Sequence, residues 1–168
     1  HGSLDEAPED GILEEQELVI STKDLSKDDW IKTRVYASIS EFFYFNKVLQ
    51  IPILFLHKLT NKSIRQIFED LIDLKNNKKF PTLSSIISSI YDHAAAILHG
   101  GAEFRLKKDW LGIYWPPGEY EYINLLKKNK FNEFYEECQI YMTESIKDDK
   151  MKKILEECIT VNKKMMRL

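Results

Sequence analysis

The spacing of apolar residues constrains this fold most, because they recur at steps of three and four through most of the chain after Ser26. The first such stretch carries a stripe at Ile31, Val35, Ser38, Phe42, Phe45 and Leu49. A second apolar set widens this stripe beyond the arc that a surface helix buries: Tyr36, Ile39, Phe43 and Tyr44. We therefore expect a helix between Ser26 and Leu49 that is covered on several sides and lies at the centre of the fold.

The same periodicity predicts further helices separated by short loops. The second helix is expected from Pro52 to Leu59, and Asn61 or Ser63 can cap the third. Thr82 is expected to cap the fourth helix, which Gly100-Gly101 ends. Three more helices are expected over 119–128, 131–145 and 148–166. Six Gly and five Pro are few for an all-β chain, which needs many turns. The predicted fold class is all-α, an irregular bundle of six or seven helices with a short N-terminal extended segment.

The charge distribution divides the chain into two parts. Residues 1–18 hold seven of the 27 acidic residues and none of the 24 Lys and Arg residues, so the rest carries 24 basic against 20 acidic residues. We interpret 1–17 as a tag remnant, His1-Gly2-Ser3, followed by an acidic flexible leader, and 18–168 as a single helical domain excised from the C-terminal part of a larger protein. The β-branched run Leu18–Thr22 is expected to form one strand without a partner.

Several classes of function fit this composition poorly. Four Arg against twenty Lys, in runs that acidic residues interrupt, do not resemble a nucleic-acid surface. The longest apolar run, Ile51–Leu56, is far shorter than the roughly 20 residues of a membrane span. Cys138 and Cys158 are interpreted as small core residues of a protein in a reducing compartment. We expect no nucleic-acid partner, no membrane span and a cytoplasmic location.

Recognised catalytic and metal-binding motifs are absent from the sequence. The chain has no glycine-rich phosphate loop, GxSxG elbow, HExxH pair or CxxC pair. His93 and His99 are six residues apart, which is not a metal-ligand spacing on one helix face. Adjacent acidic pairs such as Glu136-Glu137 diverge by about 100° on a helix, which favours solvated faces over acid–base catalysis. We assign no catalytic, cofactor-binding or metal-binding residue to this chain.

The segment Trp110–Tyr120 is the strongest candidate for a functional role in the sequence, because it has two Trp and two Tyr beside Gly and Pro. Large rings on a loop either anchor a partner or fix the loop to the bundle, and the sequence leaves both interpretations open. The candidate interface or pocket residues are three from this segment and two from the first helix: Trp110, Tyr114, Trp115, Trp30 and Arg34.

Five short motifs are spread over residues 18 to about 145: Leu18–Thr22, Asp28-Asp29-Trp30, Leu49–Pro52, His99–Glu103 and Trp110–Pro116. Their order and composition resemble the region after the catalytic barrel in cobalamin-binding radical S-adenosylmethionine proteins of the anaerobic cyclase-like Fe–S oxidoreductase type. In that family a CxxxCxxC motif in the barrel binds the iron–sulfur cluster, and a preceding domain binds cobalamin. Neither of these is present in this sequence.

The resemblance implies a non-catalytic C-terminal accessory domain that packs on the radical S-adenosylmethionine barrel of the same polypeptide and shapes substrate access. The parent protein would then carry a 4Fe–4S cluster, S-adenosylmethionine and cobalamin, whereas this chain would carry no cofactor. The alternative is a free-standing helical domain for protein interaction or small-ligand binding, because the aromatic first helix can line a pocket. A stand-alone enzyme is a third hypothesis.

Overall fold

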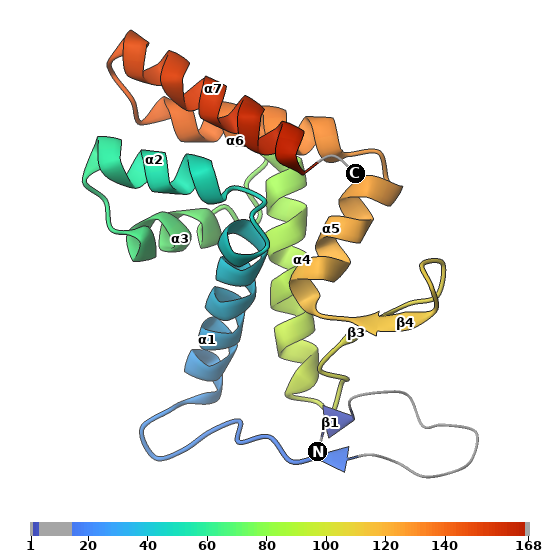
Figure 1. Cartoon of the computed structure of the whole chain (residues 1–168). Coiled ribbons are helices and arrows are strands. Elements are labelled where there is room, and N and C mark those ends of the chain that lie inside the picture. Colours follow the sequence, from blue (N-terminus) through green and yellow to red (C-terminus); the bar gives the residue numbers. More distant parts are fainter. Residues whose placement is uncertain (1, 4–14, 167–168) are drawn as a thin grey trace.

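The computed structural model describes residues 2–3 and 15–166. These residues form seven α-helices and a five-residue π-helix, η1: α1 (Lys27–Ser40), η1 (Glu41–Phe45), α2 (Gln50–Thr60), α3 (Ile64–Ile72), α4 (Pro81–Ile97), α5 (Pro117–Lys127), α6 (Phe131–Glu144) and α7 (Asp149–Met165). In Figure 1, α1 and α4 run in opposite directions at the centre, with α2 and α3 on one side, α5 on the other, and α6 and α7 across one end. The predicted all-α irregular bundle is confirmed.

Two short antiparallel strand pairs accompany the helices: β1 (Gly2–Ser3) with β2 (Glu15–Gln16), and β3 (Arg105–Lys107) with β4 (Ile113–Trp115). The predicted strand Leu18–Thr22 is wrong, since these residues join none of the strands described. A β-branched run favours extended backbone, but it forms no ladder without a neighbouring strand. Thr22 instead starts a turn, in which its Oγ1 accepts a hydrogen bond from the Leu25 amide at 3.1 Å. Most of the predicted leader, residues 4–14, lies outside the described residues.

The first helix begins as predicted and ends earlier than predicted. The Ser26 hydroxyl caps α1 by accepting a hydrogen bond from the Asp29 amide at 3.1 Å. The expected continuous helix to Leu49 is wrong, because α geometry gives way to the wider turn of η1. Adjacent residues on an α-helix diverge by about 100°. Within η1 the consecutive residues Phe42 and Phe43 are both fully buried, so this turn is covered on more than one side.

The chain bends sharply after η1, and two side chains from the C-terminal helices hold this bend. The axes of the α1–η1 segment and α2 differ in direction by 101°. The buried Asn162 amide of α7 donates to the carbonyls of Lys47 at 3.0 Å and Val48 at 2.6 Å, and its Oδ1 accepts from the Ile51 amide at 3.2 Å. The Tyr135 hydroxyl of α6 also donates to the Val48 carbonyl at 2.7 Å. Backbone groups that regular structure leaves unpaired at the bend are thereby satisfied.

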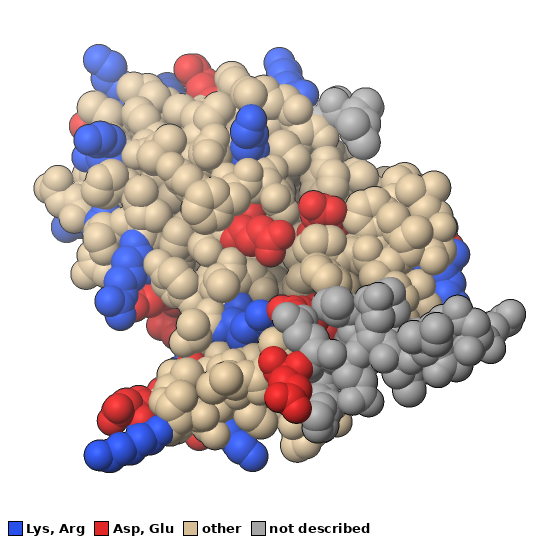
Figure 2. Space-filling model, turned by 60° about the horizontal axis from the view of Figure 1, so that its bottom comes forward, with Lys and Arg blue, Asp and Glu red and all other residues tan. Residues whose placement is uncertain are grey.

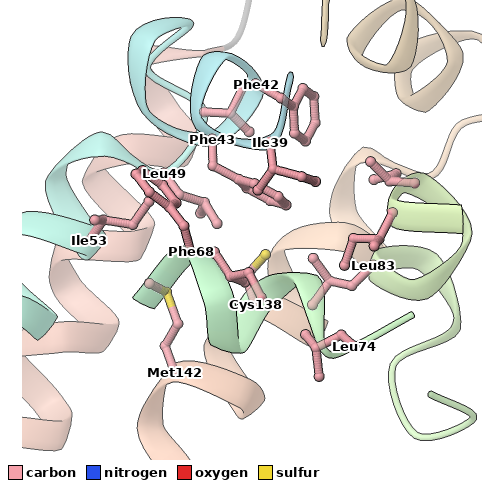
Figure 3. Close-up of a cluster of buried hydrophobic side chains, with 14 of the residues drawn as sticks. Ile39, Phe42, Phe43, Leu49, Ile53, Phe68, Leu74, Leu83, Cys138 and Met142 are labelled. Atoms are coloured by element: carbon pink, nitrogen blue, oxygen red, sulfur yellow. The ribbon is translucent and has the colours of Figure 1, made fainter. Parts of the chain in front are cut away.

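The apolar core joins residues from both halves of the chain (Figure 3). The Phe42 and Phe43 rings meet edge to face at 4.8 Å between centroids, and the Phe43 ring stacks with Phe134 of α6 at 6.2 Å. Cys138 lies in the same cluster, where burial raises the pKa of its thiol well above the ordinary value. Both cysteines are free thiols, and the interpretation of Cys138 as a core residue is confirmed, while Cys158 is half-buried.

The N-terminus of α4 is capped from another helix. The expected Thr82 cap is wrong, because α4 begins at Pro81 and the cap position is Phe80, which offers no hydrogen-bonding side chain. The buried Glu137 carboxylate of α6 instead accepts hydrogen bonds from the Thr82 and Leu83 amides, each at 2.9 Å. A negative charge is favourable at this end of a helix. This contact fixes α6 against the start of α4.

The substitution Asn162→Ala is expected to lower the free energy of unfolding by about 2–4 kcal/mol, because the Ile51 amide and Lys47 carbonyl lose their side-chain partner and the buried Val48 carbonyl keeps only Tyr135. Urea unfolding followed by circular dichroism measures this loss. The matched control is Lys164→Ala on the exposed side of α7, which should stay within about 0.5 kcal/mol of the wild type. A loss for Asn162→Ala no larger than that of the control would contradict the role of this contact.

Candidate functional site

Arg34 of α1 contacts both the Trp30 ring on the same helix and the segment that precedes β3. Trp30 is 7% exposed, and the Arg34 guanidinium carbon lies 5.5 Å from the centroid of its ring. Arg34 Nη2 also donates to Glu103 Oε1 at 2.6 Å. Arg34 therefore ties α1 to the chain that leaves α4, and these contacts of both candidate residues are made within the domain.

The segment Trp110–Tyr120, expected to be a loop, contains β4 and the start of α5, and β4 pairs with β3 in a hairpin. Arg105 pairs with Trp115 across the two strands. The connecting turn has left-handed backbone at Leu111, with φ of 60°, and at Gly112, with φ of 64°. Left-handed backbone is strained for a residue with a side chain such as leucine. The side chains of Leu111 and Ile113 are 78% and 46% exposed, so the turn presents apolar groups to the outside.

The other three candidate residues, Trp110, Tyr114 and Trp115, lie on this hairpin. The Lys127 ammonium of α5 lies 5.3 Å from the centroid of the Trp110 ring. Trp115 is half-buried, and its buried indole Nε1 has no hydrogen-bond partner among the described residues. Tyr114 lies between them in sequence, in the middle of β4. The exposed residues Leu111 and Ile113 were missed at the sequence level, although their position beside Gly112 is typical of a tight turn.

A buried ionic cluster anchors β3 to α4 and α5. The Glu121 carboxylate, 4% exposed, accepts hydrogen bonds from Ser89 Oγ at 2.7 Å and from Arg105 Nη1 at 2.5 Å. The same Arg105 nitrogen donates to Ser89 Oγ at 2.8 Å, and its guanidinium carbon lies 3.8 Å from the centroid of the Tyr120 ring. A buried carboxylate is tolerated when it is paired and hydrogen-bonded in this way. Arg105 therefore anchors β3 to α4 and α5.

His93 of α4 lies beside this cluster. Burial, and then the positive charges of Arg105 and Arg34, lower the pKa of His93, so that it is neutral at pH 7. Its Nε2 lies 3.1 Å from the Ala102 carbonyl. In the part of the chain that the structure describes, no group of three or more His, Cys, Asp or Glu side chains gathers closely enough to hold a metal ion.

The start of η1 packs against the start of α5. Burial, and the negative charge of Glu119 on α5, raise the pKa of Glu41 above its ordinary value. A β-carbon at Gly118 would lie 3.2 Å from Asn46 Nδ2 and 3.4 Å from Phe42. The close approach of these two segments therefore depends on a glycine at this position.

A groove of about 590 Å³ lies between α1, α3 and α4. Its lining residues are Lys32, Thr33, Tyr36, Arg65, Glu69, Ile72, Asp73 and Tyr91. The volume is within the range of small-molecule sites. The groove is a second candidate site, which the search for motifs in the sequence did not indicate.

Across residues 2–3 and 15–166, no single helix combines the length and the apolar character needed to cross a membrane. The segments Lys27–Phe45 and Gln50–Thr60 reach that length and composition together as a bent pair. Both contribute residues to the apolar core described above.

No family model, no curated protein and no solved structure matches this chain. Its function is therefore inferred from its sequence motifs and from the geometry of these two sites.

The substitution Arg105→Leu is expected to lower the free energy of unfolding by about 3–5 kcal/mol, because it leaves the buried Glu121 carboxylate without its cation. The double variant Arg105→Leu/Glu121→Leu removes both charges and should recover most of this loss. Thermal and urea unfolding of the two variants and the wild type measure the difference. A double variant as unstable as the single one would show that the pair is not the anchor.

Protonation of His93 is expected to destabilise the fold below neutral pH. Because the pKa of His93 is lower in the folded state than in the unfolded chain, the unfolded state binds the proton more readily as the pH falls through about 6.5. The free energy of unfolding should therefore decrease as the pH is lowered below neutral. This decrease should be less steep in His93→Gln. His99→Gln, at an exposed position after α4, is the matched histidine control. Equal slopes in all three proteins would contradict this expectation.

Proposed function

We propose that this chain is a non-catalytic helical accessory domain that packs on the barrel of a cytoplasmic radical S-adenosylmethionine enzyme within the same polypeptide. The proposal is supported by the motif resemblance over residues 18 to about 145 and by the exposed apolar turn of the β3–β4 hairpin. In this arrangement the barrel binds the 4Fe–4S cluster and S-adenosylmethionine, and a preceding domain binds cobalamin. The helical domain shapes the substrate side of the barrel.

The hairpin turn is the observation that carries the proposed contact. The β3–β4 hairpin projects from the helical bundle (Figure 1). Leu111 and Ile113, both exposed, flank Gly112 in and beside its turn. Single exposed apolar residues are common, whereas an apolar pair on a projecting, rigid turn is suited to insert into a partner surface.

The contacts that hold the hairpin and α1 support a role of the hairpin turn in binding a partner surface. Figure 2 brings the lower end of the Figure 1 view forward, where wide areas free of Lys, Arg, Asp and Glu lie between scattered charged side chains of both signs. The hairpin is held by the Arg105–Glu121 pair, and α1 is held by the Arg34–Glu103 pair. A preorganised contact loses less conformational entropy on binding than a mobile one. Trp30 and Arg34 therefore support the contact surface, and Leu111 and Ile113 form its apolar tip.

The gene upstream of the codon for Leu18 provides the first test. The proposal expects an in-frame barrel sequence with a CxxxCxxC motif. A native start codon near residue 4 without such a barrel would overturn the proposal in favour of a free-standing interaction or ligand-binding domain.

Hydrogen exchange provides the structural test. Amides of residues 105–115 should exchange more slowly in the full-length protein than in this chain alone, because the barrel covers the hairpin turn. The variant Leu111→Asp should remove this added protection in the full-length protein. Ile140→Asp is the matched control, since Ile140 is 51% exposed on α6 at the other end of the bundle. Equal exchange of the hairpin in both proteins would contradict the proposed contact.

A further inference from the structure

We propose that the groove between α1, α3 and α4 binds an ammonium or guanidinium group carried on an apolar stem. Figure 1 shows α3 on one side of α1 and α4 and the β3–β4 hairpin on the other. The groove is therefore separate from the proposed contact with the barrel. An experiment that contradicts one proposal leaves the other unaffected.

The walls of the groove combine an aromatic surface with one face of a helix. The spacing of its residues on α3 brings them onto one side of that helix: Arg65, Glu69, Ile72 and Asp73. Tyr36 of α1 and Tyr91 of α4 add two phenol rings. The Tyr36 ring is held in place by an edge-to-face contact with the core residue Phe68, at 5.8 Å between centroids. The groove therefore offers a fixed apolar surface to a ligand stem.

The charges of the groove leave a carboxylate available. Arg65 Nε pairs with Glu69 Oε1 at 2.8 Å along α3. Lys32 Nζ lies 3.4 Å from Asp29 Oδ1 on α1. Asp73, the C-cap residue of α3, is exposed and forms no ion pair with any residue that the structure describes. The cations that line the groove are thus already partnered, whereas Asp73 lines it without an ion pair among the described residues.

Lys75 shows what the aromatic end of the groove accommodates. Its Nζ lies 3.9 Å from the centroid of the Tyr91 ring, the geometry of a cation–π contact. Lys75 is an exposed residue in the loop after α3, two positions beyond Asp73. An exposed contact of this kind contributes little free energy, so a ligand cation can replace the Lys75 ammonium. Lys75 therefore occupies the Tyr91 face as an internal competitor.

These observations define the ligand. Its cation lies on the Tyr91 ring, which the Lys75 ammonium already reaches, in a groove that Asp73 also lines, and its apolar stem lies along Tyr36 and Ile72. Anionic ligands are disfavoured by the unpaired carboxylate. Two kinds of ligand carry a cation on an apolar stem: a free organic amine, and a peptide with a Lys or Arg side chain. The experiment below distinguishes them.

The test is a titration of the ¹⁵N-labelled full chain followed by amide chemical shifts. The probes are phenethylamine, its neutral isostere 2-phenylethanol, and an N-acetylated, C-amidated tripeptide Ala-Lys-Ala. Phenethylamine should shift amides around Tyr36, Asp73 and Tyr91, and 2-phenylethanol should bind several-fold more weakly. Tighter binding of phenethylamine than of the tripeptide identifies a free amine as the ligand, and the reverse order identifies a peptide side chain. Equal affinity for phenethylamine and 2-phenylethanol, or no shift at the groove with any probe, would overturn the proposal.

Two substitutions should change the affinity in opposite directions. Asp73→Asn removes the unpaired carboxylate and should weaken phenethylamine binding about two- to fivefold. Lys75→Gln removes the internal competitor and should strengthen it about two- to fivefold. Asp70→Asn is the control, since Asp70 pairs with Lys62 at 2.7 Å and does not line the groove. Unchanged affinity in both Asp73→Asn and Lys75→Gln, with spectra that show an intact fold, would contradict the proposed binding mode.

Discussion

The orientation of α2, α3 and α7 relative to α1 depends on the hydrogen bonds that Asn162 makes to the bend between η1 and α2. These bonds join residues more than 100 positions apart and pair the backbone where the chain turns by 101°. Because α2 and α3 follow the bend and α7 packs along α2, the same contact sets the position of all three helices relative to α1. The aromatic residues of η1 provide buried area, and the buried amide determines the direction in which the chain continues.

Two other buried polar side chains act in the same way. Glu137 of α6 caps α4, and Glu121 of α5 pairs with Arg105 of β3. Apolar packing tolerates many arrangements, whereas a buried polar group requires a specific partner. The central pair α1 and α4 is therefore fixed from several sides. The hairpin turn and the groove, which lie on opposite sides of this pair, are both presented by a rigid scaffold.

The sequence was sufficient to predict the helices and insufficient to predict how they are joined. The caps at Ser26 and Ser63, and the last three helices to within about two residues, follow from local signals that a single segment carries. The π turn, the cap that Glu137 supplies to α4 and the ion pair of Arg105 depend on side chains distant in sequence, which local patterns do not reveal. For the same reason, the aromatic segment near residue 110 was recognised as a candidate site while its exposed tip was not.

The most direct test of the central role of Asn162 is native-state hydrogen exchange of the Ile51 amide, which donates to the Asn162 side chain. If this contact is integral to the fold, the Ile51 amide exchanges only through global unfolding, and its exchange free energy follows the overall stability as urea is added. Exchange of Ile51 through a small local opening, as easily as the exposed amides at the end of α2, would contradict this account.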